Sequence, residues 1–187
     1  RMARDQAFVL DRLRQGVDTI RDRFDVILMD PPPALGMLSL SVLRAADALV
    51  IPAPPNNIDF GSTAHFLKML GATLNELARA GGARDYAFVK ILATKMNDGK
   101  SAHVAIKRMM DAVFPMDMLQ AVLKDSAEID NATANLSTVY ELTGAATRTD
   151  THKRCRAYLD AVGREIEVLI RKTWPSHHAQ LRKEGVL

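Results

Sequence analysis

The sequence has very little cysteine, and its histidines are scattered. Cys155 is the only cysteine, and the five histidines stand singly along the chain or side by side in a polar tail. One thiol cannot form an intrachain disulfide or a cysteine zinc site, and the histidines lack the spacing of a metal-binding set. A disulfide-stapled secreted domain and a zinc module are therefore excluded, and a reducing compartment fits the composition.

Long apolar runs are also missing. No run approaches the ~18 apolar residues that a membrane-spanning helix needs. The last twelve residues, SHHAQLRKEGVL, contain too few apolar side chains for an amphipathic membrane anchor. We therefore expect no association with membranes. The apolar fraction of 48% and charged fraction of 25% are typical of a soluble globular domain.

Charge is distributed unevenly. The net charge is only +3, but basic residues outnumber acidic ones between residues 148 and 187. Two interpretations stay open at this point: contact with a polyanion, or an ordinary solvated helix face.

Short apolar runs alternate with longer segments of helical periodicity. Strands are expected at residues 25–29 (DVILM), 47–53 (DALVIPA), 86–94 (YAFVKILAT) and 118–123 (MLQAVL). Helices are expected in five places: through the apolar positions from Leu10 to Phe24, over 37–46, from an N-cap at Asp59 to the Gly81-Gly82 pair, around 106–113, and over 148–174. This alternation predicts an α/β fold with a doubly wound, mostly parallel sheet and flanking helices.

The stretch FDVILMDPPPALG, Phe24 to Gly36, carries the first candidate site. Asp30 follows an expected strand directly, and a carboxylate at a strand end is how P-loop enzymes hold a magnesium ion beside phosphates. The alternative is that Asp30 only caps a turn, which is common for Asp before Pro. The three prolines stiffen the loop, and Gly36 would permit a positive φ where the loop enters a helix.

A phosphate-binding loop is harder to find. Gly99-Lys100-Ser101 follows an expected strand and precedes a helix, but the position that requires the first glycine of a P-loop holds Thr94. Its Cβ and hydroxyl would stand where backbone amides must close on a phosphate. We therefore interpret this segment as a polar turn, and the cradle as absent from these residues.

Several segments together resemble one family. These are FDVILMDPPPALG, LSLSVLRAADALVIPAPPNNIDFGSTAHFL, VKILATK, LKDSAEIDNAT and VGREIEVLIRKTWP. In this order they are similar to the ParA/MinD family of partitioning ATPases, and most of all to RepA-type plasmid partition proteins. The resemblance implies a deviant Walker P-loop NTPase fold, a dimer, and ATP and Mg²⁺ as cofactors. The family's Walker A loop with two lysines has no match here, so we expect the chain to correspond to the C-terminal half of its relatives, which fits the first residue, Arg1.

The resemblance also assigns residues and a domain layout. Asp30 is similar to the family's Walker B acid, the catalytic metal ligand, and Pro32 to Gly36 are similar to its second switch. Thr94, Lys95 and Met96, together with Lys124 and Asp125, would lie on the adenine side of the nucleotide. The implied layout is a C-terminal part of the ATPase domain at residues 1–147, a terminal helix packed on it at 148–174, and a polar tail at 175–187.

For partners, the resemblance implies a ParB-type centromere-binding protein that stimulates hydrolysis, and DNA bound without regard to sequence. The candidate DNA-binding residues are Arg148, Lys153, Arg154 and Arg156. A cytoplasmic, nucleoid-associated location would follow. The competing hypotheses are a nucleotide-independent DNA- or partner-binding module with the same fold, and a MinD-like membrane-associated relative, which the tail composition disfavours.

Overall fold

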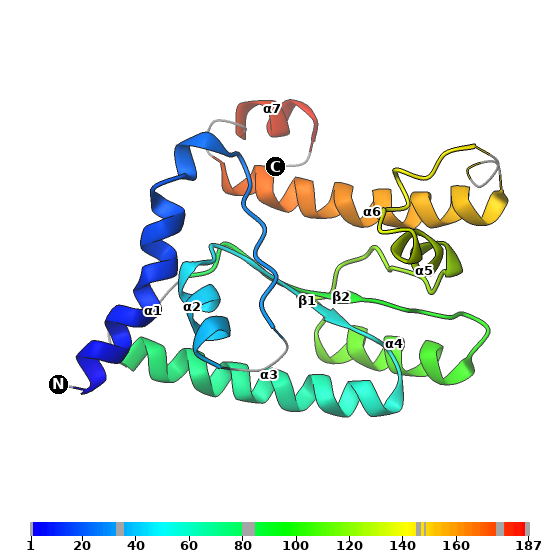
Figure 1. The fold of residues 1–187 in the computed structure, drawn as a ribbon. Helices are drawn as coiled ribbons and strands as arrows, with labels where there is room; N and C mark the ends of the chain where they lie inside the picture. The colour runs from blue at the N-terminus through cyan, green and yellow to red at the C-terminus, as the bar shows by residue number, and fades with distance from the viewer. Residues whose placement is uncertain are drawn as a thin grey trace. The chain divides into compact units, whose positions relative to one another are not determined.

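The computed structural model describes residues 2–32, 36–79, 85–144, 147, 149–174 and 178–185. Its elements, in chain order, are α1 (Met2–Asp18), the 3-10 helix η1 (Arg21–Arg23), α2 (Met37–Ala45), β1 (Leu49–Ala53), α3 (Asn57–Leu77), β2 (Val89–Ala93), α4 (Ser101–Val113), α5 (Ala127–Ala134), α6 (Asp150–Thr173) and α7 (His178–Lys183) (Figure 1). They fall into two compact units, residues 1–49 with 70–88 and residues 50–69 with 89–187. Each unit is described by itself.

The two strands pair in parallel. The Leu49 amide donates to the Phe88 carbonyl at 3.0 Å, and the Thr94 amide donates to the Ala53 carbonyl at 3.2 Å. Both partners advance along the chain together, which is the parallel register. The strands predicted at 47–53 and 86–94 are thereby confirmed, as is the α/β class.

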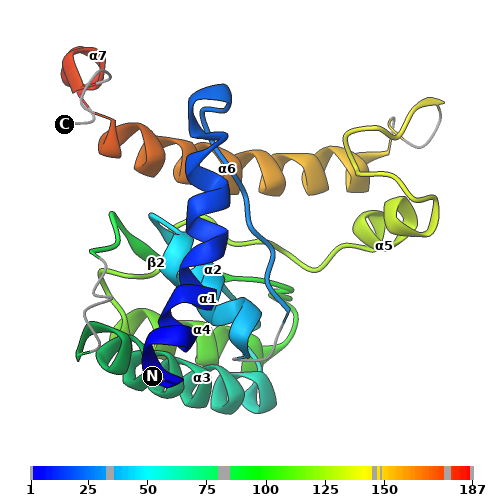
Figure 2. The same ribbon diagram turned by 60° about the vertical axis from the view of Figure 1, so that its left-hand side comes forward.

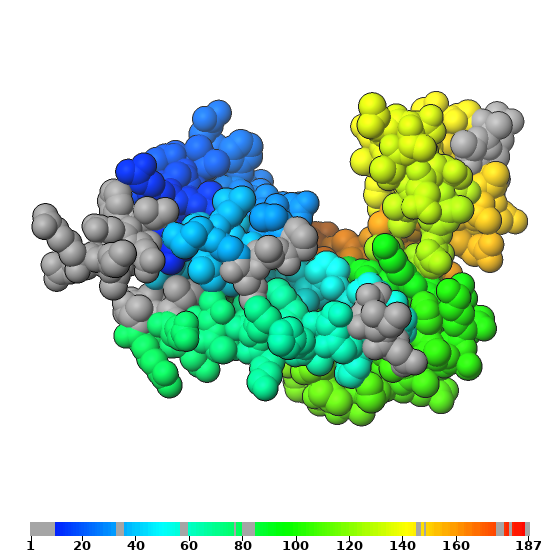
Figure 3. Space-filling view, turned by 60° about the horizontal axis from the view of Figure 1, so that its bottom comes forward, coloured from blue at the N-terminus to red at the C-terminus, as the bar shows by residue number. Residues whose placement is uncertain are grey.

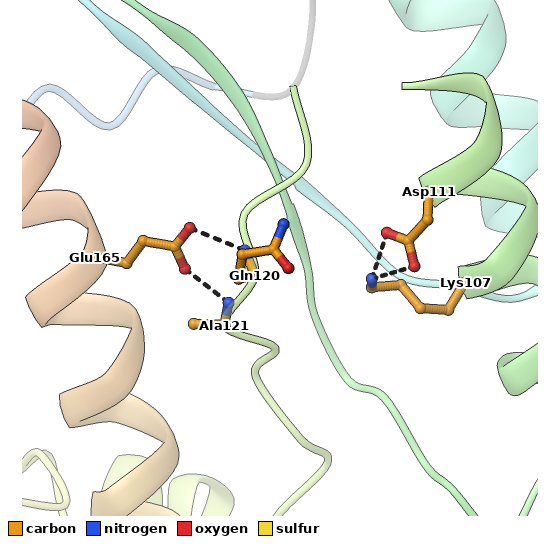
Figure 4. A network of polar contacts seen from close by, with 5 residues as sticks. All are labelled: Lys107, Asp111, Gln120, Ala121 and Glu165. Carbon is orange, nitrogen blue, oxygen red and sulfur yellow. Dashed lines mark hydrogen bonds and ion pairs between the residues drawn. The ribbon is translucent and has the colours of Figure 1, made fainter. Parts of the chain in front are cut away.

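A third segment, residues 117–125, runs beside β2 and completes the predicted parallel arrangement only in part. Two isolated parallel bridges, Ile91 with Met118 and Met96 with Lys124, mark its two ends. Between them, the amides of Gln120 and Ala121 donate to the two carboxylate oxygens of Glu165, at 2.9 and 2.7 Å (Figure 4). A side chain from α6 thus takes the place of a ladder partner, so the strand predicted at 118–123 is interrupted.

Within the second unit, α4 lies on one side of the strand segments and α6 on the other (Figures 1 and 2). The side chains of Ile91, Leu92, Met110 and Leu119 are buried. Apolar β-branched and aliphatic residues of a strand covered by helices on both faces form the core of such a layer. On α4, Lys107 Nζ lies 2.6 Å from Asp111 Oδ1, an ordinary i, i+4 ion pair (Figure 4).

A smaller lobe is built from α5, the turn after it and the start of α6 (Figure 3). Ala132, Val139 and Cys155 are its buried centre, with Ile129, Leu142 and Leu159 packed against them. The hydroxyls of Ser126 and Thr149 cap α5 and α6 by accepting from the Glu128 and His152 amides. Helix α6 matches the predicted terminal helix closely, whereas α5 was not predicted.

The C-terminal tail contains a helix, α7, that the polar composition did not predict. Leu181 on α7 is fully buried, and Arg171 of α6 lies 3.3 Å from Glu184 just after α7. One apolar anchor therefore holds an otherwise polar segment.

In the first unit, α1 packs against α2, and Arg44 on α2 holds Asp11 on α1 at 2.6 Å. The hydroxyl of Tyr86 donates to the Leu43 carbonyl at 2.7 Å. These contacts bring the segment before β2 against the end of α2.

Three sequence predictions are wrong in detail. Residues 25–29 form extended chain but no strand, and Val26 and Leu28 are 45% and 89% exposed, because no described strand pairs with this segment. The first helix ends at Asp18, so Phe24 lies beyond it and is exposed. Helix α3 begins at Asn57, which places Asp59 inside its first turn and not at the N-cap. The predicted closing pair, Gly81-Gly82, lies outside the described residues.

No helix in the described part of the chain combines the length and apolar character that crossing a bilayer requires.

Candidate functional site

The loop after β2 and the segment 123–125 are joined by their backbones. The Met96 amide donates to the Leu123 carbonyl at 3.2 Å, and the Asp125 amide donates to the Met96 carbonyl at 2.9 Å. Because parallel strands present their carboxyl ends at one edge, the residues that follow them gather there. The structure therefore brings together four of the predicted nucleotide-side residues, Lys95, Met96, Lys124 and Asp125, and Thr94 precedes them at the strand end.

Lys124 is held at this edge by an ion pair. Its Nζ lies 2.6 and 2.7 Å from the two carboxylate oxygens of Asp98. The Lys124 side chain is 23% exposed and the Asp98 side chain 65% exposed, so the pair is partly screened by water. It ties the loop after β2 to the segment before α5 through side chains as well as backbone.

The backbone at Lys95 is strained. Its φ of 51° lies in the left-handed region, which non-glycine residues seldom occupy. The Lys95 side chain is exposed while its neighbour Met96 is buried, so the strained residue projects outward from an anchored loop. Strain of this kind is concentrated at binding and catalytic loops.

Gly99 and Lys100 form a turn and not a phosphate cradle. The Asn97 side-chain oxygen accepts from the Gly99 amide at 3.0 Å, and the Asn97 carbonyl accepts from the Lys100 amide at 3.1 Å. The Asn97 amide in turn lies 3.3 Å from His103 Nδ1. The Gly99 and Lys100 amides already have acceptors within the loop, so the predicted polar turn is confirmed.

Asp30 belongs to the other unit. It is exposed and follows the extended segment that was expected to be a strand. A single exposed carboxylate suits Mg²⁺, which takes one or two protein carboxylates and fills its other positions with water and phosphate oxygens. Among the described residues there is no group of three or more His, Cys, Asp or Glu side chains that could hold a metal ion without such help.

The loop after Asp30 is described at its two ends. The Pro32 carbonyl accepts from the Ser39 hydroxyl at 3.1 Å, so this end of the expected switch is tied to α2. Gly36 is the N-cap of α2 with φ −94° and ψ −176°. Gly36 does not use the positive φ that glycine permits, because an extended N-cap residue is enough to start the helix.

The basic residues of α6 are exposed. Lys153, Arg154 and Arg156 all face water, while Arg148 lies outside the described residues. Lys153 Nζ is 3.6 Å from Asp150, a loose pair between two exposed side chains. The Arg156 guanidinium lies over the ring of Tyr140, 5.0 Å from its centroid.

Four participating residues make contacts that the sequence did not predict: Asp98, Tyr140, Asp160, which was considered only as a partner of the basic residues, and Glu165. The hydroxyl of Tyr140 donates to Asp160 at 2.6 Å, which raises the pKa of that phenol above its ordinary value of 10.0. Each of the four acts on a partner at least 20 residues away in the chain. Only Asp98 carried a local signal, since it stands in an Asn-Asp-Gly turn directly after a strand.

Comparisons with known proteins bear on the family and the fold of this chain. A sequence profile described as an AAA domain matches residues 3–79, which include Asp30. The putative replication protein A of Rhizobium rhizogenes is 28% identical over 163 residues, covering 87% of this chain and 40% of the relative. A solved partition protein superposes with a TM-score of 0.56 at 25% identity, covering 80% of this chain and 38% of that one. This chain is a relative of the ParA/MinD-type proteins.

A second solved structure extends the likeness of fold. It is a Cyanothece McdA variant in complex with ATP, with a TM-score of 0.60, 20% identity, and coverage of 87% of this chain and 60% of that one. The fold of the chain is that of the ParA/MinD-type P-loop NTPases. The chain spans 40% of the length of the replication protein A relative, so the activity of the whole protein is a matter for proposal.

Proposed function

We propose that this chain is the C-terminal part of a plasmid-partition ATPase of the ParA/RepA type. Its domain layout is the one expected from the sequence, with an ATPase-domain part at 1–147, a terminal helix at 148–174 and a tail at 175–187. The intact protein binds ATP and Mg²⁺, dimerises, binds DNA without sequence preference, and is stimulated by a ParB-type centromere-binding partner. Its place is then the cytoplasm, on the nucleoid.

The observation that carries this proposal is the meeting of two loops at one sheet edge. Residues 94–96 and 124–125 lie together there, and they are the segments for which the family resemblance implies contact with the adenine side of ATP. A partition protein and an ATP-bound McdA variant are among the solved structures that share the fold, which supports a nucleotide-binding partition protein at the level of the fold.

The phosphate side of the nucleotide does not fit the residues described. The amides of the Gly99-Lys100 turn already have acceptors, and the printed sequence has no glycine-rich loop with two lysines. Asp30 fits a magnesium ligand, but a metal carboxylate without a phosphate cradle cannot position a triphosphate. We therefore derive no hydrolytic step for this chain, and we place hydrolysis in a longer protein that supplies the cradle.

The polyanion contact is assigned to the start of α6. Lys153, Arg154 and Arg156 are exposed on its first two turns, and Arg148 precedes them in the sequence. Contacts of Lys and Arg with DNA phosphates release counterions, so the affinity falls steeply as salt rises. Contacts with phosphates alone carry no sequence preference.

A binding experiment tests this function. Fluorescence anisotropy with a mixed-sequence DNA duplex is recorded over a range of salt concentrations, with and without ATP and Mg²⁺. The 187-residue chain is compared with the protein expressed from its natural start codon. The proposal expects ATP to strengthen DNA binding by the protein from the natural start codon, with a steep salt dependence. Binding that is equal with and without ATP in that protein would contradict it.

The second candidate function is DNA binding that needs no nucleotide. The closed Gly99-Lys100 turn and the exposed basic face of α6 favour it together. In the same experiment, this function predicts that the 187-residue chain binds DNA with a steep salt slope whether or not ATP is present. A chain that binds only when a cradle and ATP are both supplied would exclude it.

A further inference from the structure

Tyr140 stands between an arginine and an aspartate of the same helix face. Arg156 and Asp160 are four residues apart on α6, a spacing at which opposite charges on a helix can pair. Tyr140, in the turn after α5, engages both of them: its hydroxyl donates to Asp160 Oδ1 at 2.6 Å, and its ring lies under the Arg156 guanidinium at 5.0 Å. Asp160 and Arg156 therefore each contact the tyrosine, one through its hydroxyl and the other through its ring.

The turn that carries Tyr140 is firmly held. Its neighbour Val139 is buried against Cys155 of α6. The Val139 carbonyl also lies 3.0 Å from Nε2 of His152, itself a buried side chain on α6. These contacts hold the backbone of the turn against the helix that carries Arg156, and the hydroxyl of Tyr140, a residue 48% exposed, is held by Asp160.

This arrangement changes what Arg156 can bind. A guanidinium that lies over an aromatic face can still donate hydrogen bonds from its N–H groups, and it loses less conformational freedom when an anion arrives. If Arg156 were paired with Asp160, that ion pair would have to break before the arginine could bind a phosphate. Tyr140 separates the two charges.

We propose that Tyr140 is a positioning residue that holds Arg156 ready for a DNA phosphate and keeps Asp160 from pairing with it. The inference rests on the proposed DNA contact of α6 and adds to it the residue that prepares the contact. Asp160 then competes with a DNA phosphate for Arg156 only when the Tyr140 hydroxyl no longer binds its carboxylate.

The test is a double-mutant cycle read by DNA affinity. Binding of a mixed-sequence duplex, with ATP and Mg²⁺ present, is measured in the protein expressed from its natural start codon for Tyr140→Ala, Asp160→Asn and the double variant. We expect Tyr140→Ala to weaken binding by roughly threefold, since Arg156 can now pair with Asp160. Adding Asp160→Asn restores most of that loss. Tyr140→Phe keeps the ring but not the hydroxyl, and its DNA affinity is expected to lie between those of the wild type and Tyr140→Ala. Because this variant keeps the packing of the ring, it also shows whether misfolding explains the loss in Tyr140→Ala.

The matched control separates position from net charge. Glu167→Gln removes the same charge from an exposed site on α6, about two turns after Asp160. In the Tyr140→Ala background it should restore clearly less affinity than Asp160→Asn. Equal restoration by both, or an unchanged affinity of Tyr140→Ala, would overturn the inference.

Arg156→Gln distinguishes failure of this inference from failure of the DNA contact. If Arg156→Gln weakens binding and lowers the salt slope by about one, the contact stands, and the cycle alone decides the role of Tyr140. If Arg156→Gln changes neither quantity, or the wild-type protein does not bind the duplex at low salt with ATP and Mg²⁺ present, the proposed contact fails and this inference fails with it.

Discussion

Lys124 Nζ lies 2.6 Å from one carboxylate oxygen of Asp98 and 2.7 Å from the other. Twenty-six residues separate the two in sequence. Their contact closes the edge of the sheet where the backbones of Met96 and Asp125 already pair. It is the one described ion pair that joins the two loops of the candidate nucleotide side.

Removing this ion pair should loosen the edge without unfolding the protein. Asp98→Ala is expected to speed hydrogen exchange of the Met96 and Asp125 amides several-fold, while the Ile91 and Leu119 amides deeper in the sheet exchange as before. The free energy of unfolding should fall by less than about 1 kcal/mol, since the pair is partly exposed. Hydrogen exchange followed by NMR measures both sets of amides.

Asp111→Ala is the matched control for this experiment. It removes the carboxylate of a similar lysine pair, Lys107–Asp111, that lies within α4 and joins no loops. It should leave exchange at Met96 and Asp125 unchanged. Equal effects of the two variants would mean that Asp98 has no special part in closing the edge.

Replacing Glu165 should lower the free energy of unfolding much more than replacing a neighbouring exposed glutamate on α6. Glu165→Gln leaves one neutral oxygen where two carboxylate oxygens accepted the Gln120 and Ala121 amides, so one amide loses its acceptor and the other loses a charged one. The expected loss is about 1–3 kcal/mol in the free energy of unfolding, measured by urea denaturation. Glu167→Gln, exposed on the same helix, should cost no more than about 0.5 kcal/mol. A loss no larger for Glu165→Gln than for this control would contradict the bridging role.

Leu136 occupies the left-handed region with φ 51°, and its side chain is 98% exposed. Leu136→Asn should therefore stabilise the protein by about 0.5–1 kcal/mol, because asparagine tolerates this conformation and no buried surface is lost. Thermal unfolding measures the change. Leu38→Asn, at an exposed leucine with ordinary helical backbone in α2, should give no stabilisation. A destabilised Leu136→Asn would indicate that this leucine has a partner.

Tyr140 should ionise at a higher pH than the ordinary value of 10.0 for a tyrosine. The hydrogen bond to Asp160, with burial and the negative charge of that carboxylate, raises the pKa of the phenol, and Arg156 offsets part of the rise. A raised folded-state pKa means that the contribution to stability is complete below the ordinary value of 10.0 and is lost as the pH rises through the folded-state pKa. Ultraviolet difference titration, with Tyr140→Phe to assign the signal, measures it.

Asp160→Asn should bring the Tyr140 pKa back down toward its ordinary value. Asp150→Asn, a change of the same charge at the start of α6, should leave it where it is. Identical titration of the wild type and Asp160→Asn would mean that the hydrogen bond does not form in solution.

The local sequence pattern correctly predicted those helices and strands whose apolar residues are buried in the structure. β1, β2, α2 and α6 all follow from apolar runs and periodicity, and they are where the sequence placed them. The segment 25–29 has the same apolar character, yet it is exposed, because a strand is completed only by neighbours that the run itself does not specify. Short α5 depends on the Ser126 cap and on packing against α6, and neither produces a long periodic signal.

The candidate site likewise contains residues that the sequence predicted and residues that it did not. Motif likeness pointed to Thr94–Met96 and to Lys124-Asp125 as separate segments, and the strand order that joins them follows from the α/β fold. The residues that hold them, Asp98 and Glu165, act across 26 and 45 residues of chain. Side-chain contacts between residues so far apart in the chain have no fixed spacing, so a local sequence pattern cannot predict them.

ATP hydrolysis by the 187-residue chain tests the central claim most directly. The account predicts no Mg²⁺-dependent phosphate release above the buffer rate from this chain. It also predicts hydrolysis that Asp30→Ala abolishes in the protein expressed from its natural start codon. Hydrolysis by the 187-residue chain alone, abolished by Asp30→Ala, would contradict it, because these residues would then hold a complete phosphate site.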